Sequence, residues 1–267
     1  MKDTITVCIP TCLNNINYLE DLLISISQQT LLPNKILIIV SNKRKTKVKL
    51  ESEIKEISLK IPKNINPDFI ISEKNGLSLA RNIGTDLCST DILIFGDDDD
   101  LWDKDRIFII KKLILKNGSC LIRHRFKTLN GHKINKAPKR YNLIPNLFLV
   151  GTGNLVGGGS NIAGATCIFK SLKFNENMSS CEDWDFWIRC LLAQINIVDS
   201  TRELVTYRIH ENRMSKNYWD TYSVEFLTRI KYLIKSSLLI SGIIIGLIKS
   251  SLRFIIIDLF KKFLKFK

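Results

Sequence analysis

The chain lacks the cysteine pattern of a disulfide-stapled or zinc-binding protein. Its seven cysteines are odd in number and scattered, and no two of them form a Cys-x-x-Cys pair. They are Cys8, Cys12, Cys88, Cys120, Cys167, Cys181 and Cys190. Neither a disulfide framework nor a zinc site is therefore expected, and a reducing compartment fits this usage best.

The first residues also lack the pattern of a secretory signal. Residues 1–3 lead directly into a short apolar run that ends at Pro10. A charged region, a long apolar segment and a cleavage site of small residues do not follow one another there. We therefore expect the body of the protein to stay in the cytoplasm.

Glycine-rich nucleotide-binding fingerprints are missing as well. Six glycines gather between residues 151 and 164, but no Gly-Lys-Ser/Thr occurs among them and no strand-to-helix unit adjoins them. The polar and glycine-rich stretch 130–164 predicts a long loop. This loop either covers a substrate site or simply connects two elements.

Positive charge, by contrast, is abundant. The 267 residues include 40 lysines and arginines against 26 acidic residues, a net charge of +14. Such an excess indicates a polyanionic partner, which can be nucleic acid, an anionic membrane surface or a phosphorylated substrate. The length suits one α/β domain, with or without an appendage.

Strand and helix patterns alternate through the first hundred residues. Continuous apolar strands separated by helices predict an α/β fold with a mostly parallel central sheet that helices cover on both faces. Strands are expected at 4–9, 36–40, 69–71, 92–95, 165–169 and 204–209, and helices at 18–26, 43–60, 77–87 and 182–193.

Four consecutive aspartates, Asp97 to Asp100, follow the apolar run 92–95. This places them at the carboxyl end of a strand, where ligands bind in parallel sheets. Neighbouring carboxylates repel one another by about 1 kcal/mol even in water. A divalent cation relieves the repulsion, and oxygen ligands favour Mg or Mn. The simpler alternative is a solvated acidic turn before a helix that begins at Trp102.

The end of the chain differs from the rest. Isoleucine, leucine and phenylalanine dominate residues 236–260, and lysines alternate with apolar residues over 261–267. Within this tail the longest charge-free stretch, 236–248, is shorter than the roughly 20 residues of a spanning helix. We expect residues 231–267 to form a helical tail on an anionic membrane surface. A helix packed on the domain and a true span are the alternatives.

This tail bears on the partner and the location of the protein. Its positive charge lies beside apolar residues, which favours lipid over nucleic acid as the polyanion. We therefore expect no nucleic-acid partner, and a peripheral position on the cytoplasmic face of the inner membrane.

Several segments, in this order, resemble the family-2 glycosyltransferases of GT-A fold, inverting enzymes that build bacterial surface polysaccharides such as lipopolysaccharide and capsule. These segments are Thr6 to Thr11, Asn75 to Gly84, the aspartate tetrad, Glu182 to Asp185, and Tyr207 to His210 with Ser215. The resemblance covers residues 4–215 and implies a GT-A domain over 1–230.

The resemblance also implies an activity. It is the metal-dependent transfer of a hexosyl or N-acetylhexosaminyl group from a nucleotide-diphosphate sugar to a hydroxyl of a saccharide or lipid-linked oligosaccharide acceptor. The implied cofactor is Mn or Mg, held by Asp97 and Asp99 with His210 closing over it.

Further roles follow from the same resemblance. Asp183 matches the family's general base, and Glu182 and Trp184 lie on the acceptor side. The residues implied to bind the nucleotide sugar are Pro10, Thr11, Ser41, Arg81, Asn82, Asp97 and Asp98.

One position departs from the family pattern. After the second strand the family usually carries an aspartate that contacts the base of the nucleotide, whereas this chain has Ser41-Asn42-Lys43. A charge-assisted hydrogen bond is lost there, so the nucleotide stays open. Two other functions also remain: a catalytically inactive GT-A-like scaffold at the membrane, and a metal-dependent phosphate-ester hydrolase.

Overall fold

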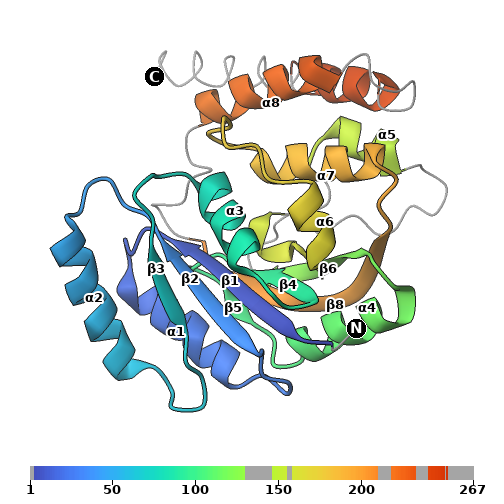
Figure 1. Ribbon diagram of the computed structural model, residues 1–267. Helices are drawn as coiled ribbons and strands as arrows, with labels where there is room; N and C mark the ends of the chain where they lie inside the picture. Colours follow the sequence, from blue (N-terminus) through green and yellow to red (C-terminus); the bar gives the residue numbers. More distant parts are fainter. Residues whose placement is uncertain are drawn as a thin grey trace, which may run out of the picture.

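The computed structural model describes residues 3–129, 146–154, 158–209, 218–232, 240–249 and 251. An eight-stranded sheet with helices on both faces forms its centre (Figure 1). The strand order is β3-β2-β1-β4-β7-β6-β8-β5. The strands are β1 (Ile5–Thr11), β2 (Lys35–Val40), β3 (Asp68–Ile71), β4 (Ile92–Phe95), β5 (Leu101–Trp102), β6 (Leu121–Thr128), β7 (Ala163–Ala165) and β8 (Ile197–Tyr207).

The half of the sheet built from β3, β2, β1 and β4 is parallel, as predicted. Cys8 in β1 is in register with Leu37 of β2 and with Phe95 of β4, so these strands end at the same edge. The helices between them are α1 (Ile16–Ser27), α2 (Lys47–Lys60) and α3 (Leu77–Leu87). All of these elements were predicted to within a few residues, most of them from their apolar pattern and α2 from a charged, lysine-rich stretch.

The other half mixes directions and corrects three predictions. β7 runs antiparallel to both β4 and β6, and β5 runs antiparallel to β8. The strand expected at 165–169 is wrong, because β7 ends at Ala165 and α6 (Thr166–Ser171) follows. The helix expected from Trp102 begins later, as α4 (Arg106–Asn117). Within the expected loop 130–164 lie α5 (Asn146–Thr152) and the 3-10 turn η1 (Gly159–Asn161).

Burial explains why Trp102 does not start a helix. The Arg106 guanidinium lies 3.8 Å from the Trp102 ring centroid, and Trp102 pairs with Val205 of β8. Its side chain is 6% exposed. Tertiary contacts thus override the local helix signal at this residue.

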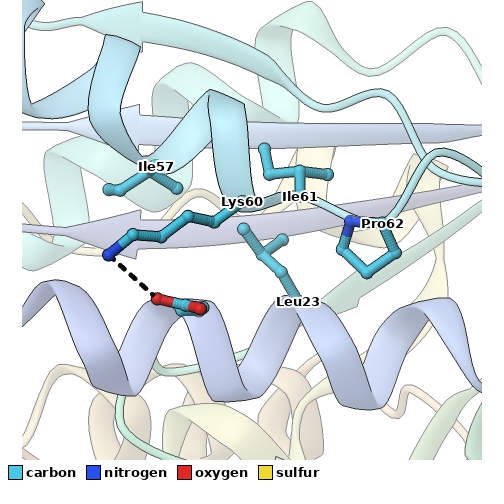
Figure 2. A pocket seen from close by; sticks show the side chains of 6 residues that line it. Leu23, Ile57, Lys60, Ile61 and Pro62 are labelled. Carbon is cyan, nitrogen blue, oxygen red and sulfur yellow. Dashed lines mark ion pairs between the residues drawn. The ribbon is translucent and has the colours of Figure 1, made fainter.

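Two apolar cores lie on opposite faces of the sheet. Side chains along β1 alternate between them, with Val7 and Ile9 in the core beneath α1, α2 and α4, and Cys8 in the other. Figure 2 shows the contact of α1 with α2, where a shallow pocket is lined by Leu23, Ile57, Ile61 and Pro62. None of these residues is among the predicted site residues.

The second core also holds the C-terminal helices. It includes Trp184 and Trp187 of α7 (Glu182–Leu192), Tyr232 of α8 (Tyr218–Tyr232), and Ile243 of the helical segment 240–249. Residues 240–249 therefore pack on the domain, which is one of the alternatives expected for the tail. None of the helices in the described ranges is long and apolar enough to cross a membrane.

Candidate active site

The first aspartate of the tetrad is held from two sides at the end of β4. The Asp97 backbone N–H donates to Ser160 Oγ (2.8 Å), and the Ser160 N–H donates back to Asp97 Oδ2 (3.1 Å). Arg81 Nη2 of α3 donates to Asp97 Oδ1 (3.1 Å). Both carboxylate oxygens of Asp97 thus have donors, which fixes its orientation.

Arg81 joins the tetrad to the start of α7. Its Nη1 donates to Glu182 Oε1 (2.7 Å), and its side chain is 1% exposed. Burial alone would lower the pKa of Arg81, but the carboxylates of Glu182 and Asp97 raise it above the ordinary value. This buried arginine therefore stays charged and brings Glu182 and Asp97, predicted separately from two motifs, into one site.

Asp183 lies beside Glu182 but has neutral donors. Asn154 Nδ2 donates to its Oδ2 (3.0 Å) and the Trp184 N–H to its Oδ1 (2.7 Å). Burial and the neighbouring Glu182 raise the pKa of Asp183 to about 7, and Arg81 opposes the shift. The residue is partly exposed. Asp183 can therefore accept a proton near neutral pH.

A pair of glycines passes between these groups. A Cβ on Gly159 would lie 1.7 Å from Arg81 Nη2 and 2.9 Å from Asp97 Oδ1. A Cβ on Gly158 would lie 2.4 Å from the Tyr207 hydroxyl. Only glycine permits so close an approach. Gly158 and Gly159 of the glycine-rich stretch thus lie in the site, while residues 130–145 and 155–157 lie outside the described residues.

Tyr207, at the end of β8, faces the same acidic groups. Its pKa is raised by burial and then by the carboxylates of Asp97, Asp100, Asp183 and Asp99. The phenol therefore stays protonated and can act as a hydrogen-bond donor among them. The sequence placed Tyr207 in a motif without giving it a role.

Two further arginines surround the tetrad. Arg106 of α4 is fully buried and donates to the Phe95 carbonyl (2.9 Å) and to the Ser160 carbonyl. Arg208 Nε donates to the Asp99 carbonyl (3.1 Å), and the Arg208 N–H donates to Asp100 Oδ1 (3.3 Å). Burial lowers the pKa of Arg106 to about 9, against the effect of Asp100 and Asp97.

The sequence gave no role to Arg106, Ser160 or Arg208. A usable signal existed for Arg106, because it lies on the buried face of α4 with Ile107 and Ile110. A cation on an apolar helix face needs an anionic or carbonyl partner. Ser160 has no such signal, since its partners are 54 and 63 residues away.

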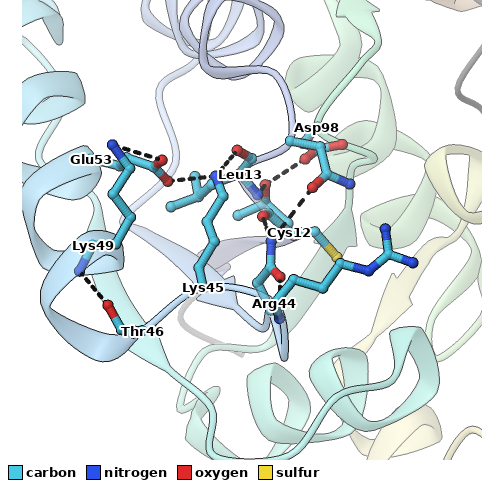
Figure 3. A network of polar contacts seen from close by, with 11 residues as sticks. Cys12, Leu13, Arg44, Lys45, Thr46, Lys49, Glu53 and Asp98 are labelled. Atoms are coloured by element: carbon cyan, nitrogen blue, oxygen red, sulfur yellow. Dashed lines mark hydrogen bonds and ion pairs between the residues drawn. The ribbon is translucent and has the colours of Figure 1, made fainter.

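The ends of β1 and β2 form the opposite wall. The Thr11 hydroxyl donates to the Asp98 carboxylate, and the Ser41 N–H donates to the Thr11 carbonyl (2.9 Å). Burial, Asp99 and Asp97 raise the pKa of Asp98 to about 7, although Thr11 opposes the shift. Figure 3 shows this wall with Cys12, Arg44 and Asp98. Pro10, inside β1, is in register with Ile39.

Two predicted residues are engaged elsewhere. Asn82 donates to the Phe174 carbonyl (2.9 Å) and to Glu176 Oε1 (2.7 Å), and it accepts from the Phe174 N–H (2.9 Å). Trp184 is 1% exposed, and its Nε1 donates to the Val150 carbonyl (2.7 Å). Both side chains support the site by packing. His210 and Ser215 lie outside the described residues.

The donor set suits a hard divalent cation only in part. Asp97 and Asp99 offer oxygen ligands, which suit Mg or Mn. Within the described ranges, no group of three or more histidine, cysteine, aspartate or glutamate side chains is arranged to hold a metal ion. Mg is commonly bound through one or two carboxylates together with substrate phosphates. The tetrad fits that arrangement, in which a nucleotide diphosphate supplies the remaining ligands.

Comparisons with known proteins agree with this geometry. The sequence matches the family model described as glycosyl transferase family 2 over residues 6–171. No curated protein sequence matches it.

Similar solved structures include two of S. aureus TarS 1-349. In complex with UDP-GlcNAc it is 20% identical, with a TM-score of 0.65 over 86% of this chain and 67% of TarS. In complex with UDP it is 19% identical, with a TM-score of 0.63 over 86% and 66%. The chain thus spans about two thirds of the length of TarS 1-349.

A third similar structure is the mannosyltransferase PcManGT from Pyrobaculum calidifontis in complex with GDP-Man and Mn2+. It is 15% identical, with a TM-score of 0.61 over 89% of this chain and 72% of that chain. These likenesses, with the family match, confirm the GT-A fold expected from the motifs.

Proposed function

The chain belongs to glycosyl transferase family 2, and we propose that it is an inverting, metal-dependent glycosyltransferase. It moves a hexosyl or N-acetylhexosaminyl group from a nucleotide-diphosphate sugar to a hydroxyl of a saccharide acceptor in cell-surface polysaccharide synthesis. The observation that carries the proposal is the buried Arg81, which contacts Asp97 of the tetrad and Glu182 beside the candidate base.

The tetrad side suits a nucleotide diphosphate. Thr11 and Ser41 at the ends of β1 and β2 would border the nucleotide, and Arg81 supplies a fixed positive charge beside Asp97. Asp97 and Asp99 would hold the divalent cation, which supplies positive charge to the leaving diphosphate when it is bound. Complexes of similar proteins with UDP-GlcNAc, and with GDP-Man and Mn2+, support a donor of this class.

The α7 side suits the acceptor. A general base works best when its pKa lies near the operating pH, and the pKa of Asp183 is raised to about 7. It takes the proton from the acceptor hydroxyl as that oxygen attacks the anomeric carbon. Tyr207, protonated and close to the same carboxylates, can donate a hydrogen bond to a substrate oxygen.

The ion pair of Glu182 with Arg81 supports an inverting mechanism. A retaining mechanism through a glycosyl-enzyme needs a second free carboxylate as the nucleophile. Glu182 is 7% exposed and bonded to Arg81, so Asp183 is the available carboxylate at the start of α7. One base without a paired nucleophile fits a direct displacement.

The test is release of nucleoside diphosphate from UDP-glucose, UDP-GlcNAc and GDP-mannose, with and without saccharide acceptors. We expect release that depends on an acceptor and on Mn or Mg and that stops in excess EDTA, and NMR should give a product of inverted anomeric configuration. Cleavage at phosphorus, with release of nucleoside monophosphate or inorganic phosphate, would indicate the phosphate-ester hydrolase. Donor binding without turnover would indicate the inactive scaffold.

A further inference from the structure

The two C-terminal helical segments each leave an apolar stripe exposed. Phe226, Leu227 and Ile230 form the stripe on α8. Ile244, Ile245 and Ile248 form the stripe on residues 240–249. Both stripes have the spacing i, i+1, i+4, which places each set on one helix face. The six side chains are 37% to 64% exposed, and together we call them the apolar surface.

The opposite faces of the same helices are fixed on the domain. Tyr232 and Ile243 are 4% and 1% exposed in the core that holds Trp184. A Cβ on Gly242 would lie 2.2 Å from the Phe148 carbonyl of α5, so this helix lies directly against the α5 backbone. The apolar surface therefore belongs to the folded domain and is held in a defined orientation.

This concentration is unusual within the described part of the chain. Each of the other elements and loops that expose large apolar side chains has at most two of them, and those two are seven or more residues apart: Val48 and Leu59 on α2, Phe108 and Leu115 on α4, and Leu32, Leu87 and Leu129 singly. Apolar side chains scattered singly are normal on a soluble protein, whereas a contiguous apolar patch marks an interaction surface.

Charge identifies the occupant of this surface. From the start of α8 at residue 218 to the end, the sequence has nine lysines and arginines and three acidic residues, Asp220, Glu225 and Asp258. An apolar helix face within a strongly basic segment is the pattern of a helix lying in the interface of an anionic bilayer. Basic residues near such a bilayer add attraction to the burial of the apolar side chains.

We propose that the apolar surface of α8 and residues 240–249 inserts into the headgroup region of an anionic phospholipid bilayer. The surface thereby includes α8, which the sequence assigned to the catalytic domain, as well as the tail.

The position of α5 relates this surface to the site. α5 lies between residues 240–249 and α7, because Val150 accepts from Trp184 Nε1 while Phe148 contacts Gly242. Asn154, just after α5, holds Asp183. On this side of the molecule, the helix of residues 240–249 and then α5 thus lie between the proposed bilayer and the base. If the proposed transferase function holds, the acceptor is a lipid-linked saccharide presented at that bilayer.

The first experiment tests the surface without catalysis. The full chain is sedimented with vesicles of phosphatidylcholine alone or mixed with phosphatidylglycerol, at low and high salt. We expect binding to the anionic vesicles that persists in part at high salt, because apolar insertion is not screened. Two triple variants, F226S/L227S/I230S and I244S/I245S/I248S, should each bind at least about 10-fold more weakly.

A matched control removes apolar side chains of similar exposure elsewhere. The double variant V48S/L59S on α2 should bind as the natural chain does. Equal melting temperatures show that the variants are folded. The proposal is overturned if the natural chain ignores anionic vesicles or if the triple variants bind normally. It is also overturned if the triple variants dissociate a dimer, since a second copy of the chain would then cover the surface.

A second experiment separates this proposal from the proposed function. Transfer to a lipid-linked saccharide in anionic vesicles is compared with transfer to a soluble saccharide. The triple variants should lose about 10-fold on the vesicle-borne acceptor and keep their rate on the soluble one. If vesicle binding follows the prediction but neither acceptor is used, the proposed function fails while the lipid surface stands. Equal loss on both acceptors would contradict a lipid-linked substrate.

Discussion

The tetrad at the end of β4 and the acid pair at the start of α7 balance their negative charge in different ways. Three arginines, Arg81, Arg106 and Arg208, surround the tetrad. In the acid pair, Glu182 binds Arg81, which also binds Asp97 of the tetrad. The hydrogen bonds described for Asp183 come from neutral donors, the Asn154 amide and the Trp184 N–H.

This difference separates two tasks. Charges fixed by buried arginines stay in place and suit the binding of a phosphate or cation. A carboxylate with neutral donors in a partly buried position has a raised pKa, and it can take up and release a proton. The pKa of Asp98, like that of Asp183, is raised to about 7. Its neighbours Asp99 and Asp97 contribute to that shift, and a bound cation would remove their effect.

The largest effect is expected from removing a charge in the tetrad. Asp99→Asn should lower transfer by about 100- to 1000-fold, since one ligand of the cation that would neutralise the leaving diphosphate is lost. The fold should stay intact, because like-charge repulsion is relieved. Steady-state kinetics with Mn, together with calorimetric donor binding, measure the change. Asp86→Asn, on an exposed residue of α3, is the control, and full turnover by Asp99→Asn would refute a metal-binding tetrad.

Removing the charge of the base, Asp183, should lower the rate of transfer somewhat less. Asp183→Asn should lower kcat by about 100-fold or more while donor affinity changes little. For the natural chain, kcat/KM should rise as pH increases through about 7, because only the carboxylate form of Asp183 accepts a proton. A collapse of donor affinity with kcat retained would make Asp183 a binding residue.

Stability should change in the opposite direction in the same variant. The folded-state pKa of Asp183 is raised from 3.8 to about 7, so its contribution to stability is present below 3.8 and is lost as pH rises toward 7. Asp183→Asn should therefore melt a few degrees higher than the natural chain at pH 8 and show little gain near pH 4. Glu203→Gln, at an exposed position of β8, is the control and should show no such pH-dependent gain.

The two regions also differ in how far the sequence predicts them. The strands before the tetrad are continuous apolar runs, and their parallel pairing puts Thr11, Ser41 and the tetrad at one edge. The apolar runs, with the rule that such strands pair in parallel, are enough to predict that arrangement. The acid pair was found only through its motif, because its partners Arg81 and Asn154 come from distant segments.

The failures have physical causes of the same kind. Residues 166–169 are apolar enough for a strand, but the chain turns into α6 where Phe169 packs on Phe95 at 5.2 Å between ring centroids. A short apolar run does not distinguish a buried helix from a strand. The roles of Asn82 and Trp184 stay predictions, and the structure adds that their polar atoms bond to Phe174 and Val150. Sequence order cannot reveal such satisfied contacts.

A milder change alters an arginine beside the tetrad and leaves all of its aspartates in place. Arg106→Lys keeps the buried charge but cannot span both the Phe95 and Ser160 carbonyls. Ser160 would then hold Asp97 less firmly, and the KM for Mn and donor should rise about 10-fold with a smaller fall in kcat. Arg202→Lys, on a half-exposed side chain, is the control. A uniform loss of folded protein with unchanged KM would limit Arg106 to a structural role.

The smallest effect is expected at the nucleotide edge of the tetrad region, where the chain departs from its family. Ser41 is 5% exposed, and its backbone bonds to Thr11, which in turn bonds to Asp98. A hydrogen bond made by a neutral hydroxyl contributes about 0.5–1.5 kcal/mol of net free energy. Ser41→Ala should therefore weaken binding of the preferred nucleoside diphosphate by about 2- to 10-fold and leave kcat unchanged. Calorimetric titration with UDP and GDP measures this, with Ser58→Ala on α2 as the control. The substitution keeps the backbone bond of residue 41 to Thr11, so it removes only the side-chain hydroxyl. Equal affinity in Ser41→Ala would therefore place the base of the nucleotide away from the end of β2.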